Sequence, residues 1–294
     1  MRKILMTLAA VLCCAITASA QDAQTDRNRT YRITLNDVQY AHHNEEMSAG
    51  DAVGKIITGA LTGQTSVQAT KYEDDVKNAI IKGLSGAYRF RYNDGLLQLN
   101  DVVEEGNLVV DAIIINIKSN SSSRTWKDKE DKTKVSTTYT GVAEVMLTLK
   151  DAKTGEIMAN PSFKGQGTSG SSYSTSDKAI QDALNGLSNR ITAWFNNYRP
   201  LCANIIEGGA AKKDKQKEVY IDFGSNEGAF VGLHMGVYIV KTVAGREAKS
   251  QIGKLKIEAV EGDDISRCKV QSGGKEIKAA LDAGQQLQVI SIDK

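Results

Sequence analysis

VAEVMLTLKDAKTGEI, residues 142–157, holds the clearest strand signal of this chain. Apolar and polar residues alternate over residues 142–150, which predicts a β-strand with one buried face. The segment Asp151–Gly155 is rich in turn-forming residues, so residues 157–159 are expected to return as a second strand. These elements predict that the first two thirds of the chain are built around a sheet.

Three neighbouring segments extend this unit. Residues 108–117 are almost all apolar and mostly β-branched, which predicts a strand covered on both faces. The polar residues 119–140 are expected to form an exposed hairpin or loop between the two strands. In residues 177–198, apolar side chains recur every three or four positions, as in a long amphipathic helix, and Pro200 ends that helix.

The preceding segments predict further elements of one mixed α/β (α+β) domain over residues 21–200. Residues 31–40 alternate in polarity and predict a strand. Thr70 and Glu73 form a capping-box pair, which predicts a helix that begins there. Residues 88–92 alternate again and predict a strand after this helix.

Two stretches of this domain carry weaker patterns. Glycines interrupt residues 48–69, and four glycines within fourteen residues weaken any helix. A glycine-spaced helix and an ordered loop both stay open for this stretch. A short helix is expected near residues 96–103.

The composition changes after the long helix. Residues 201–217 contain a run of Gly, Ala and Lys and are expected to be a linker. From residue 218 to residue 294, short alternating strands are separated by glycines, with one weak helix near residues 276–281. This spacing is typical of a small β-barrel or sandwich.

Residues 1–20 have the pattern of a cleaved signal peptide. Arg2 and Lys3 precede an apolar run, and residues 18–20, Ala-Ser-Ala, suit a signal peptidase. The run is too short to span a membrane as a helix, and no membrane span is expected in the mature chain. The pattern predicts a periplasmic protein, and a peripheral position at the outer membrane stays open.

The charge balance argues against a nucleic-acid partner. The full chain has a formal net charge of +2, and cleavage after residue 20 removes two basic residues and no acidic one. The mature chain is therefore neutral, whereas proteins that bind nucleic acid usually carry a basic face.

Two cysteines, Cys202 and Cys268, remain after cleavage. An oxidising periplasm would allow a disulfide between them, but they lie on opposite sides of residues 208–217. Two small buried thiols are the favoured interpretation.

No motif in the sequence supports catalysis or a cofactor. Residues 165–170 match G-x-G-x-x-G, but the predicted helix begins too late for its amino terminus to meet a phosphate. His42 and His43, with the nearby glutamates, lack a second cluster that would complete a metal site. His234 stands alone in a glycine-framed turn. We therefore expect no metal, no cofactor and no enzymatic activity.

Four aromatic residues are candidates for contact with a ligand or partner: Tyr88, Phe90, Tyr92 and Trp126. Exposed aromatic rings can stack on sugars, which motivates a glycan-binding interpretation. Core packing is the favoured interpretation for the first three, because they alternate with arginines in a predicted half-buried strand.

The order of these elements resembles that of two protein families. Residues 108–117, the strand and turn at 142–157 and the helix at 177–198 resemble the periplasmic domain of the curli secretion (CsgG-like) family. Residues 72–92 fit an earlier part of the same domain. Residues 219–260 are similar to the carboxyl-terminal β domain of the flagellar assembly protein T family. The resemblance implies the fold and a setting in the cell envelope.

The chain also departs from the curli secretion family. That family consists of lipoproteins that insert hairpins into the outer membrane, and this chain lacks a lipidated cysteine. Residues 119–140 are rich in charge and residues 161–175 in Gly and Ser. Each lysine near a bilayer midplane costs about 2–4 kcal/mol, so neither segment suits a membrane-spanning hairpin.

These observations predict a non-enzymatic periplasmic accessory or scaffold protein for secretion or cell-envelope assembly in a Gram-negative bacterium. The expected partners are other envelope proteins, with outer-membrane components and peptidoglycan also open. A periplasmic module that binds a small ligand, glycan or peptidoglycan is the alternative, and an oligomeric outer-membrane pore is the least favoured. Homo-oligomerisation stays open.

Overall fold

The computed structural model describes residues 27–41, 72–93, 105–167 and 171–292. The predictions for the signal peptide, for residues 48–69 and 96–103, and for His42 and His43 lie outside these residues. By contacts, the chain divides into an α/β unit, Tyr31–Phe195, and a barrel unit that joins the residues before Tyr31 to those from Asn196 onward.

A mixed sheet forms the α/β unit. Its strands are β1 (Tyr31–Tyr40), β2 (Phe90–Tyr92), β3 (Leu108–Lys127), β4 (Thr133–Asp151), β5 (Ile157–Ala159) and β6 (Ser162–Gln166). They lie in the order β2-β1-β3-β4-β5, and β6 also pairs with β4. β1 runs parallel to β2 and β3, whereas β3 and β4 form a long antiparallel hairpin. The predicted strands at 31–40 and 157–159 are confirmed.

The prediction that residues 108–117 are covered on both faces is wrong. Leu108, Val110 and Ala112 are buried in the core, but Val109 and Ile113 on the opposite face are only half-buried among the described residues. The apolar run therefore forms a strand with one buried face, as in β4.

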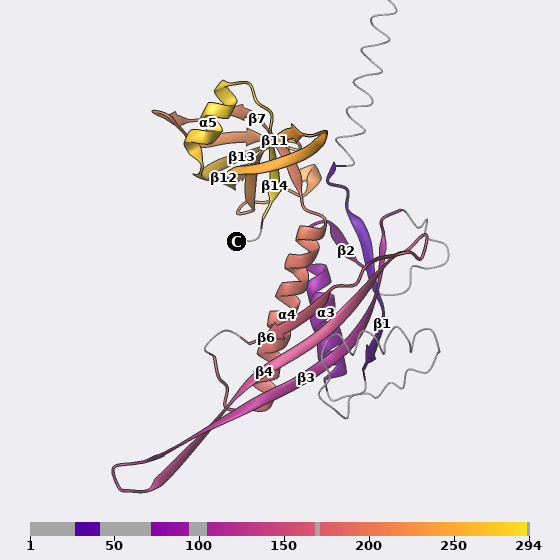
Figure 1. Cartoon of the computed structure of the whole chain (residues 1–294), viewed down its shortest axis with the longest axis vertical. Coiled ribbons are helices and arrows are strands. Elements are labelled where there is room, and N and C mark those ends of the chain that lie inside the picture. The colour runs from indigo at the N-terminus through magenta and orange to yellow at the C-terminus, as the bar shows by residue number, and fades with distance from the viewer. Residues whose placement is uncertain (1–26, 42–71, 94–104, 168–170, 293–294) are drawn as a thin grey trace, which may run out of the picture. The chain divides into compact units, whose positions relative to one another are not determined.

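Two helices pack side by side on one face of this sheet (Figure 1). They are α3 (Glu73–Ser85) and α4 (Ser176–Tyr198). The long helix predicted at 177–198 is confirmed. The start of α3 differs from the predicted capping box, because Tyr72 occupies the N-cap and makes no side-chain capping hydrogen bond. Thr70 lies outside the described residues.

Glycines allow the helices to approach the sheet and each other closely. A Cβ on Gly141 in β4 would lie 2.1 Å from the Ala179 carbonyl oxygen of α4. A Cβ on Gly165 in β6 would lie 2.2 Å from the carbonyl oxygen of Ala183. Gly165, the first glycine of the G-x-G-x-x-G match, is thus placed where the helix backbone leaves no room for a side chain.

An aromatic cluster fills the core at the carboxyl end of α4. The Phe195 side chain is fully buried, and its ring packs edge-to-face against Phe90 at 5.3 Å and Trp194 at 5.1 Å between centroids. Phe163 of β6 packs against Trp194 in the same way at 6.1 Å. Aromatic pairs of this geometry add stability beyond the area they bury.

The turn after β4 depends on the buried carboxylate of Asp151. One carboxylate oxygen accepts hydrogen bonds from the backbone N–H groups of Lys153 and Thr154, both at 2.9 Å. The other accepts from the N–H of Gly106 at 3.0 Å. Burial alone would raise the pKa of this carboxyl, but these hydrogen bonds outweigh burial and lower it.

We expect Asp151→Asn to destabilise the chain by about 2 kcal/mol at neutral pH, because an amide cannot accept all these bonds. A lowered folded-state pKa gives stability that is present above the unfolded value and is lost as the pH falls through the folded value. Urea unfolding should therefore show that wild type and variant differ less in their free energy of unfolding at pH 3 than at pH 7. The matched control is Asp131→Asn at the exposed tip of the β3–β4 hairpin. An equal effect of the two substitutions would contradict this role of Asp151.

The outer part of the β3–β4 hairpin, residues 119–140, forms an exposed arm (Figure 1). Within the described residues, β1 pairs with β3 only as far as Ile114, and β6 pairs with β4 only from Val142. Apart from one β-bridge between Tyr139 and Tyr173 near its base, the arm is therefore a two-stranded hairpin, one of the two forms predicted for these residues.

The second unit contains a closed barrel of six strands. They are β7 (Cys202–Gly208), β10 (Glu218–Ile221), β11 (His234–Val243), β12 (Arg246–Val260), β13 (Ser266–Ser272) and β14 (Leu287–Ser291), in the order β10-β13-β12-β11-β14-β7. The remaining elements are a hairpin of β8 (Ala211–Lys212) and β9 (Lys215–Gln216), the short helix η1 (Ser225–Glu227) and the helix α5 (Gly274–Asp282). The predicted small β-barrel is confirmed.

The linker predicted over residues 201–217 is wrong. Cys202–Gly208 forms β7, which pairs with both β14 and β10 and closes the barrel. The Gly, Ala and Lys residues that follow belong largely to the β8–β9 hairpin. The barrel therefore begins at residue 202 and not at residue 218.

An amino-terminal clasp, formed by Arg27 and Asn28, belongs to the barrel unit. The Arg27 guanidinium donates to the Asp222 carboxylate at 2.9 Å and also pairs with Glu227 at 3.3 Å. The Asn28 amide donates to the Cys202 carbonyl at 2.7 Å, and its oxygen accepts from the Cys202 N–H at 2.8 Å. The side chain of Asn28 thus pairs with β7 as a neighbouring backbone would.

Candidate functional site

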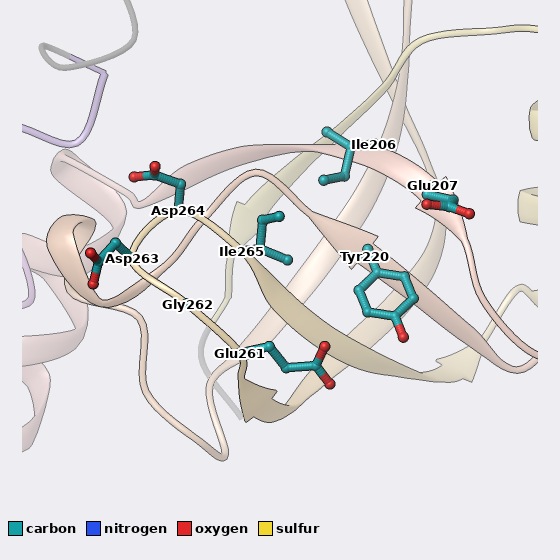
Figure 2. A pocket seen from close by; sticks show the side chains of 8 residues that line it. All are labelled: Ile206, Glu207, Tyr220, Glu261, Gly262, Asp263, Asp264 and Ile265. Carbon is teal, nitrogen blue, oxygen red and sulfur yellow. The ribbon is translucent and has the colours of Figure 1, made fainter.

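The barrel carries an open hollow of about 480 Å³ on its outer surface. Its lining residues are Ile206, Glu207, Tyr220, Glu261, Gly262, Asp263, Asp264 and Ile265. They come from β7, β10 and the connection between β12 and β13. Figure 2 shows Ile206, Ile265 and Tyr220 between the acidic residues, and we call this surface the acid-rimmed hollow.

Ile206 of β7 is exposed beside a β-bulge. Ile205 pairs with Ile221 and Glu207 pairs with Tyr220, so Ile206 has no residue opposite it on β10. Its side chain lies on the outer face of the barrel, opposite to that of the buried Ile205, and 52% of its surface is exposed. Ile265, which comes directly before β13, is 41% exposed. Together they form an apolar floor that faces solvent.

Carboxylates surround this floor, and no basic residue is among those that line the hollow. Glu261 pairs with the neighbouring Arg267 at 2.8 Å, and Asp263 accepts a hydrogen bond from the Ser225 hydroxyl at 3.0 Å. Arg267 is itself shared with Glu218 and with a further glutamate of β12. The surface around the floor is therefore negative.

This arrangement suits binding of a cation with an apolar stem. The methylene groups of a lysine or arginine side chain can lie on an aliphatic surface while the charged head stays in water near carboxylates. The Tyr220 ring adds a face on which such a cation is attracted. Among the described residues, no three His, Cys, Asp or Glu side chains are arranged to hold a metal ion.

The four aromatic candidates from the sequence do not form one surface. Phe90 is buried against Phe195, and Tyr88 and Tyr92 are half-buried. Trp126 is 45% exposed on the arm. Trp126 is separated from Leu108, the residue at which β3 enters the core, by roughly 60 Å of extended strand. The structure therefore leaves only Trp126 as an openly exposed ring.

Cys202 and Cys268 form no disulfide with each other in the structure. Cys202 is half-buried in β7, and Cys268 is fully buried in β13. Both strands pair with β10, where Val219 lies opposite Cys268 on one side and Gly208 on the other. Burial, with a smaller contribution from the charge of Glu258, raises the pKa of Cys268 to about 12. Its thiol is therefore a small interior side chain and a poor nucleophile.

The remaining sequence candidates also lie apart. His234 is the first residue of β11, half-buried. The G-x-G-x-x-G match runs from β6 into residues that the structure does not describe. In the described part of the chain, no helix is long and apolar enough to cross a membrane.

Comparison with known proteins does not identify a family. No family model matches the chain, and no curated protein matches it. It is similar to protein XCC0632 from Xanthomonas campestris, with 9% identity over 57% of this chain and 84% of that one, at a TM-score of 0.31. It is also similar to the hypothetical protein CT253 from Chlamydia trachomatis, with 9% identity over 57% and 95% at a TM-score of 0.28. Lipoprotein GNA1162 from Neisseria meningitidis matches with 11% identity over 57% and 96% at a TM-score of 0.19.

Proposed function

We propose that this chain is a non-enzymatic accessory protein of the cell envelope of a Gram-negative bacterium. It would hold other envelope proteins together, as a scaffold in secretion or assembly. The signal-peptide pattern of residues 1–20 and the resemblance to curli secretion and flagellar assembly proteins support the setting.

The observation that carries the proposal is the acid-rimmed hollow. Two exposed isoleucines, Ile206 and Ile265, and the half-buried Tyr220 form an apolar surface within a negative rim. Apolar centres with polar rims are typical of protein contact sites. The partner would present a basic segment, because opposite charge steers association and disfavours acidic partners.

Ile206→Asp is expected to lower recovery of the partner about tenfold in pull-downs from envelope fractions, because it removes the centre of the apolar floor and adds a carboxylate. The matched control is Val243→Asp on the β11–β12 hairpin, where an aliphatic side chain is 60% exposed outside the hollow. Raised salt should weaken the wild-type contact, because screening reduces attraction between exposed charges.

A photo-reactive side chain placed at position 206 then identifies the contact directly. It should give specific cross-links that the same group at position 243 does not give. Identical cross-linking at both positions, or loss of the partner in both aspartate variants, would count against the hollow as the contact surface.

A further inference from the structure

The exposed arm, residues 119–140, has one face that combines an aromatic ring with cations (Figure 1). Trp126 of β3 lies opposite Lys134 of β4, and Arg124 precedes Trp126 by two residues in the same strand. Residues opposite each other, and residues two apart in one strand, lie on the same face of a hairpin. All three residues are exposed. We call Arg124, Trp126 and Lys134 the cationic face of the arm.

The acidic residues of the arm leave this face positive. Residues 119–140 contain five basic and three acidic residues, a net charge of +2. Asp128 pairs with Lys134 at 3.5 Å, and the other two acidic residues pair with lysines at the tip, at 2.7 and 2.9 Å. Among the described residues, none forms an ion pair with the Arg124 guanidinium. Its charge is therefore available to a partner.

The outer part of the arm has no support from a third strand. Among the described residues, no strand pairs with the outer edges of 119–127 or 133–138. These nine residues of β3 extend for about 30 Å. A two-stranded hairpin alone is marginally stable in water, so contact with another surface would stabilise the arm.

The cationic face and the acid-rimmed hollow are complementary in charge and in chemistry. The hollow offers the two exposed isoleucines and four carboxylates. Two of these carboxylates, on Glu207 and Asp264, form no ion pair within the described residues. Tryptophan and arginine are the residue types that most often dominate protein contacts. An aromatic ring can cover the isoleucines while the neighbouring cation meets the rim.

We propose that the acid-rimmed hollow of one chain binds the cationic face of the arm of a second copy. This inference rests on the proposed function, because it names the partner of the same surface. The arm and the hollow are different surfaces, so the contact is heterologous, and each copy would use its arm on one neighbour and its hollow on another. Such contacts build rings when the rotation closes and filaments when it does not.

Two other hairpins of the chain also carry cations. Arg246 and Lys249 belong to the β11–β12 hairpin, and Lys212 belongs to the β8–β9 hairpin. Residues 240–250 and 211–216 contain no aromatic residue, however. Only the arm joins a cation to an exposed ring, and the other hairpins therefore provide matched controls of charge.

Analytical ultracentrifugation of the protein without residues 1–20 tests the contact. Wild type should form oligomers whose share grows with concentration over the micromolar range, and raised salt should dissociate them. Arg124→Glu, Trp126→Ala and Ile206→Asp should each weaken association about tenfold, because each removes part of one complementary surface. Arg246→Glu makes the same charge change on another exposed hairpin and should have no effect.

Mixing two defective variants provides the sharper test. The double variant Arg124→Glu with Trp126→Ala keeps its hollow, and Ile206→Asp keeps its arm. Each alone should stay monomeric, whereas an equimolar mixture should form one-to-one dimers, because it retains one working arm and one working hollow for each pair. Dimers in the mixture also show that both variants are folded.

Three results would overturn the proposal: a wild type that is monomeric at every concentration, a mixture that does not associate, or equal loss of association in Arg246→Glu. A monomeric wild type includes the case in which the arm binds the hollow of its own chain, since that contact does not depend on concentration. If such a monomer still loses an envelope partner through Ile206→Asp in the pull-down, the contact between copies is wrong and the proposed function stands.

Discussion

Gly165→Val is expected to destabilise the α/β unit by about 3 kcal/mol or more, because the new side chain has no space. A Cβ at this position would lie 2.2 Å from the backbone carbonyl oxygen of Ala183 and 2.6 Å from Cβ of Leu187. The first of these atoms belongs to the backbone of α4, so relief requires that the helix move away from β6. That movement would open the core between helix and sheet.

The measurement is urea unfolding followed by tryptophan fluorescence. Both tryptophans of the chain, Trp126 and Trp194, belong to the α/β unit, so this signal reports on that unit and not on the barrel. The control is Lys164→Val, one residue earlier in β6, where the side chain is exposed and forms only a surface ion pair with Glu144. If both valine variants unfold at the wild-type urea concentration, close packing of α4 on β6 does not stabilise the unit.

Phe195→Ala is expected to cost about 3–5 kcal/mol, the range for truncation of a buried phenylalanine. The ring is fully buried and contacts both Phe90 and Trp194 edge-to-face. Its removal leaves a cavity between α4 and β2 and separates the two remaining rings. Thermal unfolding by circular dichroism, together with the urea midpoint, measures the loss.

Trp126→Ala is the comparison for this truncation, because it removes a larger ring from the exposed arm. Exposed substitutions usually change stability by less than about 0.5 kcal/mol. Similar losses of stability in the two variants would contradict the larger contribution that we assign to the aromatic cluster.

Much of the fold follows from residue patterns that are local in sequence. Apolar and polar residues alternate over residues 142–150 and 31–40 because β4 and β1 each bury one face. The spacing of apolar residues over 177–198 likewise matches the buried stripe of α4. Glycine-separated strands after residue 218 likewise predict the barrel. In each case, buried residues recur with the repeat of the strand or helix to which they belong.

Sequence patterns fail where tertiary contacts decide the structure. The sequence predicts a linker at β7 because its few alternating residues, Ala203 and Ile205, lie beside a run of Gly, Ala and Lys. Only pairing with β10 and β14 makes that segment a strand. The apolar run at 108–117 suggested two covered faces, but composition alone does not show which layer lies on which side.

The acid-rimmed hollow cannot be predicted from the sequence for the same reason. The acid-rimmed hollow joins residues of β7, β10 and the β12–β13 connection, and the register between strands far apart in sequence cannot be derived from either strand alone. The sequence indicates the aromatic candidates, but the burial of Phe90 depends on its packing against Phe195 of α4.

The amino-terminal clasp has a consequence for the order of folding. Arg27 and the Asp222 carboxylate that holds it are separated by 195 positions in the chain. The α/β unit lies between these two parts of the chain and makes its internal contacts without either of them. Folding can therefore complete the α/β unit first, whereas Arg27 and Asn28 join the barrel unit only after β7 and residues 222–227 have folded.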